Sequence, residues 1–253
     1  IEGDAIELDE NLPLGTIKTI EDVAHDYDLI ESDIEISNLI KLLEQQDSVC
    51  FDTETTGLNP LTAEIVGLSF SWEAHKGYYV YINLGDEQRV IDFFKPFFSN
   101  DNVGKVAQNI KYDINVLLKY GVEVKGKLFD TMLAHYLLQP DMNHNMNFLS
   151  ETYLNYRPIS IESLIGKKGK NQKTMREVEK SELVKYAAED ADVTWQLMQK
   201  FTPLLDQKEV RALFEKIEMP LVPVLSTMEN NGVSLNSSTL KELSVDLESE
   251  IKK

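Results

Sequence analysis

Three short apolar segments close together near the start of the chain constrain its fold more than any other feature. They occupy residues 48–51, 65–70 and 77–82, and each is rich in residues that favour strands. Because they follow one another so closely, they predict an antiparallel meander. Residues 105–108 predict a short fourth strand. The first half of the chain therefore indicates a β-sheet.

Helical patterns surround and follow these strands. Apolar residues recur at helical spacing in six segments: 34–43, 90–98 (where Pro96 opposes a helix), 110–118, 131–138, 181–201 and 208–230. Asp130 stands where the N-cap of one of them would be, and Gly121 closes another. Strands come early and helices dominate late, so we expect an α/β domain with one mixed sheet and a helical C-terminal extension.

Composition excludes several classes of protein. The 253 residues are 42% hydrophobic, enough to bury a core, and they contain one cysteine, Cys50, which forms no internal disulfide. No apolar run reaches the ~18 residues of a membrane span, and no secretory signal opens the chain. The chain begins with Ile-Glu-Gly instead of Met, so we expect a piece of a longer protein.

Charge is distributed unevenly. The net charge is −18, and residues 1–35 hold twelve acids against a single base, Lys18. We expect residues 1–24 to be an acidic linker. Residues 166–180 oppose this background with six bases against two acids and predict a mobile basic loop, which either contacts phosphate or is simply solvated. A net charge of −18 by itself opposes nucleic-acid binding.

The most informative residues are carboxylates. Asp52 and Glu54 end an apolar strand at spacing i, i+2, so they point to one face, where they either attract a divalent cation or form a solvated edge pair. Asp113 shares the apolar flank of its helix, either as a ligand or as a buried acid that pairs with a neighbour such as Lys111. Tyr186 and Asp190 project together at i, i+4, whereas Glu189 and Asp192 face elsewhere. The four acids are enough for two divalent ions.

Three segments carry a resemblance. Residues 52–58 (Asp-Thr-Glu-Thr-Thr-Gly-Leu), 108–113 (Gln-Asn-Ile-Lys-Tyr-Asp) and 186–190 (Tyr-Ala-Ala-Glu-Asp) resemble the three exonuclease motifs of the DEDD superfamily, in its tyrosine branch. Further segments, at 129–132, 169–172, 217–225 and 229–233, resemble the 3′→5′ proofreading domain of bacterial DNA polymerase I, a family A DNA polymerase. The resemblance covers roughly residues 25–253.

The resemblance implies a ribonuclease H-like sheet flanked by helices, an exonuclease domain at 25–205 and the start of a polymerase region at 206–253. It implies two divalent ions, Mg²⁺ or Mn²⁺, with Zn²⁺ as an option at one site. Asp52 would bridge both ions, Glu54 and Asp190 would complete the first site, and Asp113 would hold the second. Tyr186 would orient the attacking water, and the product would be a deoxynucleoside 5′-monophosphate.

Substrate contacts follow from the same resemblance. Leu58 would wedge against the terminal base, and the other residues expected to bind substrate are Thr55, Gln108, Asn109, Tyr112 and Lys170. The chain departs from the family at Asn143, where an Arg is frequent, and at Ile161, where relatives carry an aromatic side chain. His144 is expected to be a hydrogen-bonded loop histidine and not a metal ligand.

The resulting hypothesis is a metal-dependent 3′→5′ exodeoxyribonuclease acting on single-stranded or frayed DNA ends. The implied partners are DNA 3′ ends and the polymerase region of the same chain, in a monomer of the bacterial cytoplasm without membrane association. Two alternatives stay open: an RNA-trimming exonuclease of the ribonuclease D type, and a catalytically silent scaffold of a polymerase.

Overall fold

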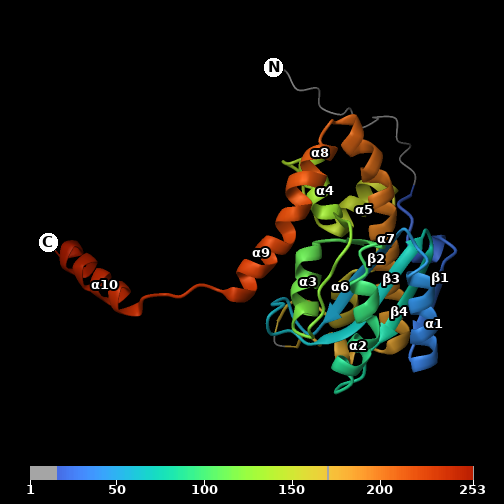
Figure 1. Ribbon diagram of the computed structural model, residues 1–253, viewed down its shortest axis with the longest axis horizontal. Coiled ribbons are helices and arrows are strands. Elements are labelled where there is room, and N and C mark those ends of the chain that lie inside the picture. The colour runs from blue at the N-terminus through green and yellow to red at the C-terminus, as the bar shows by residue number, and fades with distance from the viewer. Residues whose placement is uncertain (1–15, 170, 253) are drawn as a thin grey trace.

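A mixed sheet forms the centre of the molecule (Figure 1). The computed structural model describes residues 16–169 and 171–252. Within them the strand order is β1-β4-β3-β2-β5-β6. The bounds are β1 (Asp26–Ile30), β2 (Ser48–Thr55), β3 (Ile65–Glu73), β4 (Lys76–Tyr81), β5 (Gly104–Ala107) and β6 (Leu128–Asp130). Strands β2, β3 and β4 pair antiparallel, which confirms the predicted meander.

Parallel pairing extends the meander on both sides. Strand β1 pairs with β4, β5 with β2, and β6 with β5, all in parallel. The sequence analysis predicted β5 but neither edge strand. Strand β1 lies in the acid-rich segment and alternates exposed with half-buried residues, and β6 has only three residues. Such short or charged strands carry little apolar signal and form because a neighbouring strand offers hydrogen bonds.

Helices make up most of the remaining chain. They are η1 (Ile20–Asp22), α1 (Asp33–Leu43), α2 (Glu87–Phe98), α3 (Ile110–Leu118), α4 (Thr131–Leu138), α5 (Met146–Leu154), α6 (Ile161–Ile165), η2 (Met175–Glu177), α7 (Lys180–Gln207), α8 (Arg211–Leu213), η3 (Phe214–Glu218), α9 (Met219–Asn231) and α10 (Ser237–Ile251). All six predicted helices are present. The predicted helix at 208–230 starts later, at Arg211, because Glu209 adopts a left-handed conformation (φ 58°).

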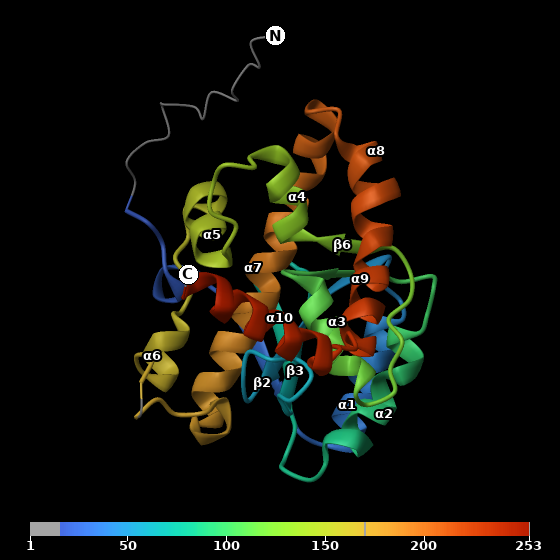
Figure 2. The same cartoon turned by 90° about the vertical axis from the view of Figure 1, so that its left-hand side faces the viewer.

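The two faces of the sheet differ in what covers them, and Figure 2 shows α7 on one side and α1 and α2 on the other. Phe51 and Phe70 point toward α2, where Phe70 stacks on Phe94 at 5.2 Å between ring centroids. The opposite face carries small residues beneath α7. A β-carbon added at Gly77 would lie 2.7 Å from the carbonyl oxygen of Ala188, so α7 lies directly against the strands.

The C-terminal helices leave the sheet. Helix α9 packs against α3, and the chain then extends to α10, which stands apart from the body with every described residue exposed (Figure 1). In the part of the chain that is described, no helix is both long and apolar enough to span a membrane.

Candidate active site

The carboxyl end of β2 brings the first two acids together. Asp52 and Glu54 lie on the face of β2 that α7 covers, as the alternation of strand side chains predicts. Glu54 is 6% exposed and Asp52 is half-buried. Two carboxylates are therefore held side by side in a poorly hydrated place.

Helix α7 adds a third carboxylate and a phenol. Its close approach over Gly77 brings Tyr186 and Asp190 to the end of β2. The Tyr186 hydroxyl forms a hydrogen bond with Asp190, and the Asp190 carboxylate is buried. The predicted i, i+4 pair thus faces Asp52 and Glu54, and the three acids and Tyr186 line one cleft.

Asp113 reaches the same strand from the other side. It is 1% exposed, and its Oδ1 accepts hydrogen bonds from the backbone N–H of Thr53 at 3.1 Å and from Thr53 Oγ1 at 2.6 Å. Lys111, its proposed alternative partner, instead pairs with Glu229. Asp113 therefore sits behind Thr53, without lining the cleft itself.

Asp130 orients the helix that carries Asp113. Its carboxylate accepts hydrogen bonds from the backbone N–H groups of Asn109 and Ile110 at the start of α3. The same carboxylate caps α4 through Met132 and Leu133, as its predicted N-cap position implies. One buried carboxylate thus accepts hydrogen bonds at the N-termini of both α3 and α4.

The electrostatics of the four acids favour a nearby cation. Burial raises the pKa of Asp52 to about 6 and raises the pKa of Glu54, Asp113 and Asp190 well above the ordinary range. The Asp52 carboxylate raises the pKa of the other three further. Two buried oxygens, Oε1 of Glu54 and Oδ1 of Asp190, have no hydrogen-bond partner.

These features fit a hard divalent cation. Carboxylate oxygens are the ligands that Mg²⁺ and Mn²⁺ prefer, and a cation would relieve the repulsion among the acids. Within residues 16–169 and 171–252, no three His, Cys, Asp or Glu side chains are already arranged to hold a metal ion. Asp52, Glu54 and Asp190 line one cleft and two of their oxygens are unpaired, so the chemistry of these residues fits such a cation.

The cleft beside these acids has a volume of about 440 Å³. Leu58 lines it and is 89% exposed, so it is not packed in a turn. Tyr112 also lines it, and its hydroxyl donates to the carbonyl of Gly57 at 2.6 Å and lies 2.6 Å from Thr55 Oγ1. The predicted substrate residues Thr55, Leu58 and Tyr112 are therefore together. Glu162, Lys168, Gln172 and Lys173 also line the cleft. Lys168 and Lys173 belong to the predicted basic loop and Gln172 to the segment 169–172, whereas the sequence analysis did not single out Glu162.

Gln108 and Asn109 lie outside the lining of this cleft. Gln108 donates to the carbonyl of His144 at 2.7 Å and accepts from Thr131, so its amide is used within the protein. Asn109 adopts a left-handed conformation as the N-cap of α3. His144 is hydrogen-bonded to His135, as expected of a loop histidine. Lys170 falls outside the described residues.

The basic stretch at 166–180 is less free than predicted. Arg176 donates to the backbone carbonyls of Ile65 and Ile82 and pairs with Glu87. Its guanidinium therefore links the ends of β3 and β4 to α2. Lys180 pairs with Glu31. These contacts of Arg176 and Lys180 join residues that are at least 89 positions apart, so no local sequence pattern predicts them. Lys168 and Lys173 stay at the cleft wall.

The opposite flank of α7 carries two further acids that help to hold the helix. Asp192 accepts from the Tyr27 hydroxyl at 2.8 Å and from the backbone N–H of His75 at 2.8 Å. Glu189 accepts from the backbone N–H of Ile159 at 2.6 Å and from Tyr156 at 2.5 Å. Both face away from the cleft, as the helical spacing predicted, and they tie α7 to the strands and loops beside it.

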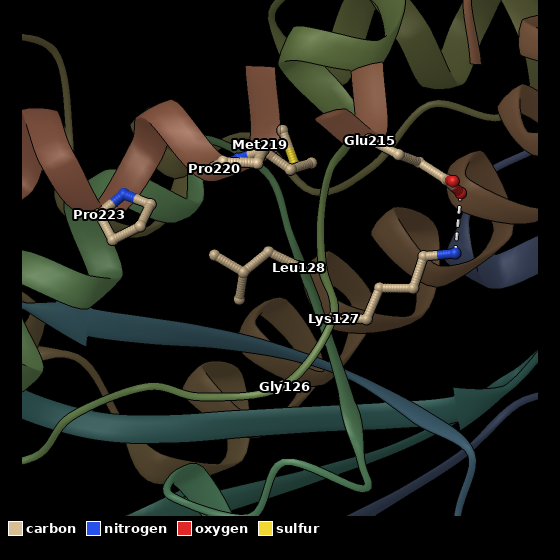
Figure 3. Close-up of a pocket in the computed structure, with 7 residues that line it drawn as sticks. All are labelled: Gly126, Lys127, Leu128, Glu215, Met219, Pro220 and Pro223. Atoms are coloured by element: carbon tan, nitrogen blue, oxygen red, sulfur yellow. Dashed lines mark hydrogen bonds and ion pairs between the residues drawn. The ribbon is translucent and has the colours of Figure 1, made fainter. Parts of the chain in front are cut away.

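A separate cavity of about 240 Å³ lies between the start of β6 and the C-terminal helices (Figure 3). It is lined by Gly126, Lys127, Leu128, Glu215, Met219, Pro220 and Pro223. Its polar rim is an ion pair between Lys127 and Glu215, at 2.8 Å. None of the predicted site residues lines this cavity, and the chemistry belongs to the cleft at β2.

Comparison with known proteins places this geometry in context. Residues 27–206 match the family model described as 3′-5′ exonuclease. The chain is 33% identical over 233 residues to DNA polymerase I of Borreliella burgdorferi, covering 90% of this chain and 25% of that protein. It is 34% identical over 227 residues to DNA polymerase I of Pseudomonas aeruginosa, covering 85% and 25%. The chain thus spans about a quarter of the length of these relatives.

Two solved structures show the same fold. The POL domain of Pol1 from M. smegmatis, in complex with DNA primer-template and dNTP, superposes with a TM-score of 0.70 at 16% identity and covers 89% of this chain and 35% of that one. Escherichia coli RNase D superposes with a TM-score of 0.64 at 14% identity, covering 80% and 51%. At such identities the likeness concerns the fold alone, and it agrees with the expected ribonuclease H-like sheet.

Proposed function

The chain belongs to the 3′-5′ exonuclease family, and on that premise we propose that it hydrolyses the 3′-terminal phosphodiester of single-stranded or frayed DNA. The product would be a deoxynucleoside 5′-monophosphate. The observation that carries the proposal is the convergence of Asp52, Glu54 and Asp190 with Tyr186 in one cleft, two of the acids having an unpaired buried oxygen. Relatives of this chain are named DNA polymerase I, which favours DNA as the substrate.

We infer that the four carboxylates hold two divalent cations, Mg²⁺ or Mn²⁺, or Zn²⁺ at one site. Such a pair lowers the pKa of an attacking water and stabilises the leaving 3′-oxygen. Asp52 would contribute to both positions, Glu54 and Asp190 would complete one, and Asp113, which is hydrogen-bonded to Thr53, would serve the other. The Tyr186 hydroxyl, beside Asp190, would orient the attacking water.

The cleft walls suit a DNA end. Leu58 presents an exposed apolar side chain that can pack against the terminal base, and Tyr112 braces its turn through Gly57. Lys168 and Lys173, which also line the cleft, can contact backbone phosphates. Lys170 stays a predicted contact. Gln108 would contribute indirectly, by holding the loop at His144, because its side-chain amide is already hydrogen-bonded to the carbonyl of His144.

A 3′-end degradation assay tests the proposal. A 5′-labelled single-stranded oligonucleotide incubated with Mg²⁺ or Mn²⁺ should shorten stepwise from its 3′ end, and EDTA should stop the reaction. Asp52→Ala and Asp190→Ala should each lower the rate at least 1000-fold, since each removes a ligand of the proposed ions. Asp246→Ala, an exposed acid on α10, is the matched control and should keep full rate. Equal rates in all four proteins would refute the proposal.

The same assay with an RNA oligonucleotide tests the first alternative, an RNA-trimming exonuclease. The fold likeness to RNase D is what favours an RNA-trimming activity. An RNA oligonucleotide of the same sequence should be degraded at least tenfold more slowly than the DNA. The reverse preference would favour the ribonuclease D-type activity. No degradation of either substrate would favour the silent scaffold, which the retention of all four acids opposes.

The remaining expectations concern the whole protein. We propose that residues 25–205 form the exonuclease domain, that residues 206–253 begin a polymerase region, and that residues 1–24 act as a linker, of which 1–15 lie outside the described residues. The polymerase region of the same chain would deliver frayed 3′ ends to the cleft. A monomeric state and a place in the bacterial cytoplasm stay predictions.

A further inference from the structure

Tyr79 is a buried phenol next to the candidate active site. It lies in β4, has 0% exposure, and is paired in register with Ser69 of β3, which in turn is paired with Asp52 of β2. Residues in register on neighbouring strands point to the same face of a sheet. Tyr79 therefore lies on the same face as Asp52 and Glu54, two strands away and beneath α7.

Gly67 directs the phenol toward Glu54. A β-carbon added at Gly67 would lie 2.3 Å from Cε2 and 2.4 Å from Oη of Tyr79, so the end of the phenol fills the space of a side chain at position 67. Gly67 is the cross-strand partner of Glu54. Directly opposite residues have β-carbons about 5 Å apart. The Tyr79 hydroxyl thus occupies the place of the nearest cross-strand neighbour of Glu54.

Both groups have unused hydrogen-bonding capacity. The Tyr79 hydroxyl and Oε1 of Glu54 are buried atoms without a hydrogen-bond partner. Burial, and after it the Glu54 carboxylate, raise the pKa of Tyr79 well above its ordinary value, so the hydroxyl keeps its proton and is available as a donor. An unpaired buried donor and an unpaired buried acceptor are each costly, and pairing them would remove both costs.

The surroundings exclude a direct contact with substrate. Tyr79 packs in a small apolar cluster with Val66, Met175, Leu183 and Ala187, and it does not line the cleft. Any effect of the hydroxyl on hydrolysis must therefore pass through a neighbouring side chain.

We propose that Tyr79 is a positioning residue whose hydroxyl donates a hydrogen bond to Oε1 of Glu54 and holds this carboxylate in the orientation that binds a divalent cation. The inference rests on the proposed function, because it assigns Glu54 a cation. Groups that hold a metal ligand in place typically change metal affinity by about 10- to 100-fold when they are removed.

Tyr79→Phe tests the role because it removes the hydroxyl and leaves the ring. The matched control is Tyr78→Phe, at the next position of β4, where the ring stacks on Trp72 on the other face of the sheet. Mn²⁺ binding to the full chain, measured by calorimetry without DNA, should weaken about tenfold in Tyr79→Phe and stay unchanged in Tyr78→Phe. In EDTA, Tyr78→Phe should melt like the wild type, and Tyr79→Phe should melt about 2–4 °C lower because it loses one hydrogen bond. The KM for an oligonucleotide should not change while kcat falls.

The outcomes separate this inference from the proposed function. If the wild-type chain binds Mn²⁺ and Tyr79→Phe binds it equally well, the positioning role is wrong and the proposed function stands. Weaker binding together with a melting temperature in EDTA lowered by about 10 °C or more, far beyond the loss of one hydrogen bond, would mean that Tyr79 acts only in packing, which also overturns the role. If the wild-type chain binds no Mn²⁺, the two-metal function fails and the positioning role fails with it.

Discussion

At the scale of single residues, the site depends on neighbours that are not ligands. Thr53 stands between the two acids of β2, and because strand side chains alternate it points away from them and meets Asp113. Thr53 belongs to a motif that can be recognised in the sequence. Its hydrogen-bond partner, Asp113, lies 60 residues away, so the contact cannot be predicted from the sequence. Tyr79 is a similar case, because its place beside Glu54 depends on a glycine in a third strand.

Thr53→Val should therefore impair hydrolysis. Valine keeps the shape of threonine but removes the Oγ1 donor, which is 2.6 Å from Asp113, so this carboxylate loses one of its two hydrogen bonds. We expect kcat for 3′-end hydrolysis to fall by about 10- to 100-fold, with a loss in unfolding free energy of about 1 kcal/mol. Steady-state kinetics and thermal melting measure both. Thr62→Val, at an exposed loop position, is the control, and an unchanged kcat in Thr53→Val would show that Asp113 needs no such support.

At the scale of elements, the decisive packing is that of α7 on the sheet. The helix carries Tyr186 and Asp190 on the cleft side and Glu189 and Asp192 on the other, so one segment both supplies the chemistry and anchors itself. The sequence predicted this division from helical spacing alone. It did not predict how close α7 lies, because that depends on Gly77 in a strand more than 100 residues earlier.

Gly77→Ala should push α7 away from β4. The added β-carbon would lie 2.7 Å from the carbonyl oxygen and 2.8 Å from the β-carbon of Ala188, and neither is a flexible side-chain end. We expect the free energy of unfolding, measured by urea denaturation, to fall by about 2 kcal/mol. The hydrolysis rate of the variant should also be lower at urea concentrations at which it is still folded.

The control for this substitution is Gly169→Ala. The nearest atom to its added β-carbon, the carbonyl oxygen of Lys167, is 4.0 Å away, so the stability should change by less than about 0.5 kcal/mol. If the two alanine variants unfold at the same urea concentration, the tight contact of α7 with β4 does not limit the stability.

At the scale of the whole molecule, the net charge of −18 has to be reconciled with a DNA substrate. Much of the negative charge lies in the first 35 residues, and four of the acids are the proposed cation ligands. Without cations, the carboxylates of the cleft would repel a DNA phosphate. Among the described residues that line the cleft, only Lys168 and Lys173 carry positive charge that could offset this repulsion. The acidity therefore predicts that divalent ions control DNA binding.

DNA affinity should rise when divalent ions are added. We expect a phosphorothioate oligonucleotide, which resists hydrolysis, to bind at least tenfold more tightly with Mn²⁺ than in EDTA, because the ions neutralise the carboxylates that repel the backbone. Fluorescence anisotropy measures both affinities, and Asp190→Ala should lose most of the gain. Tight binding of the wild-type chain in EDTA would contradict this account.

The sequence by itself determined the meander of β2, β3 and β4, the main helices and the family of the chain, because apolar periodicity and short motifs are local patterns. It also singled out Asp52, Glu54, Asp113, Tyr186 and Asp190, whose catalytic roles stay predictions. Only the tertiary structure decided which polar atoms are already satisfied: Gln108 and Arg176 are used within the protein, whereas oxygens of Glu54 and Asp190 are unpaired. The physical reason is that hydrogen bonds between distant segments form only after the sheet and α7 have packed together.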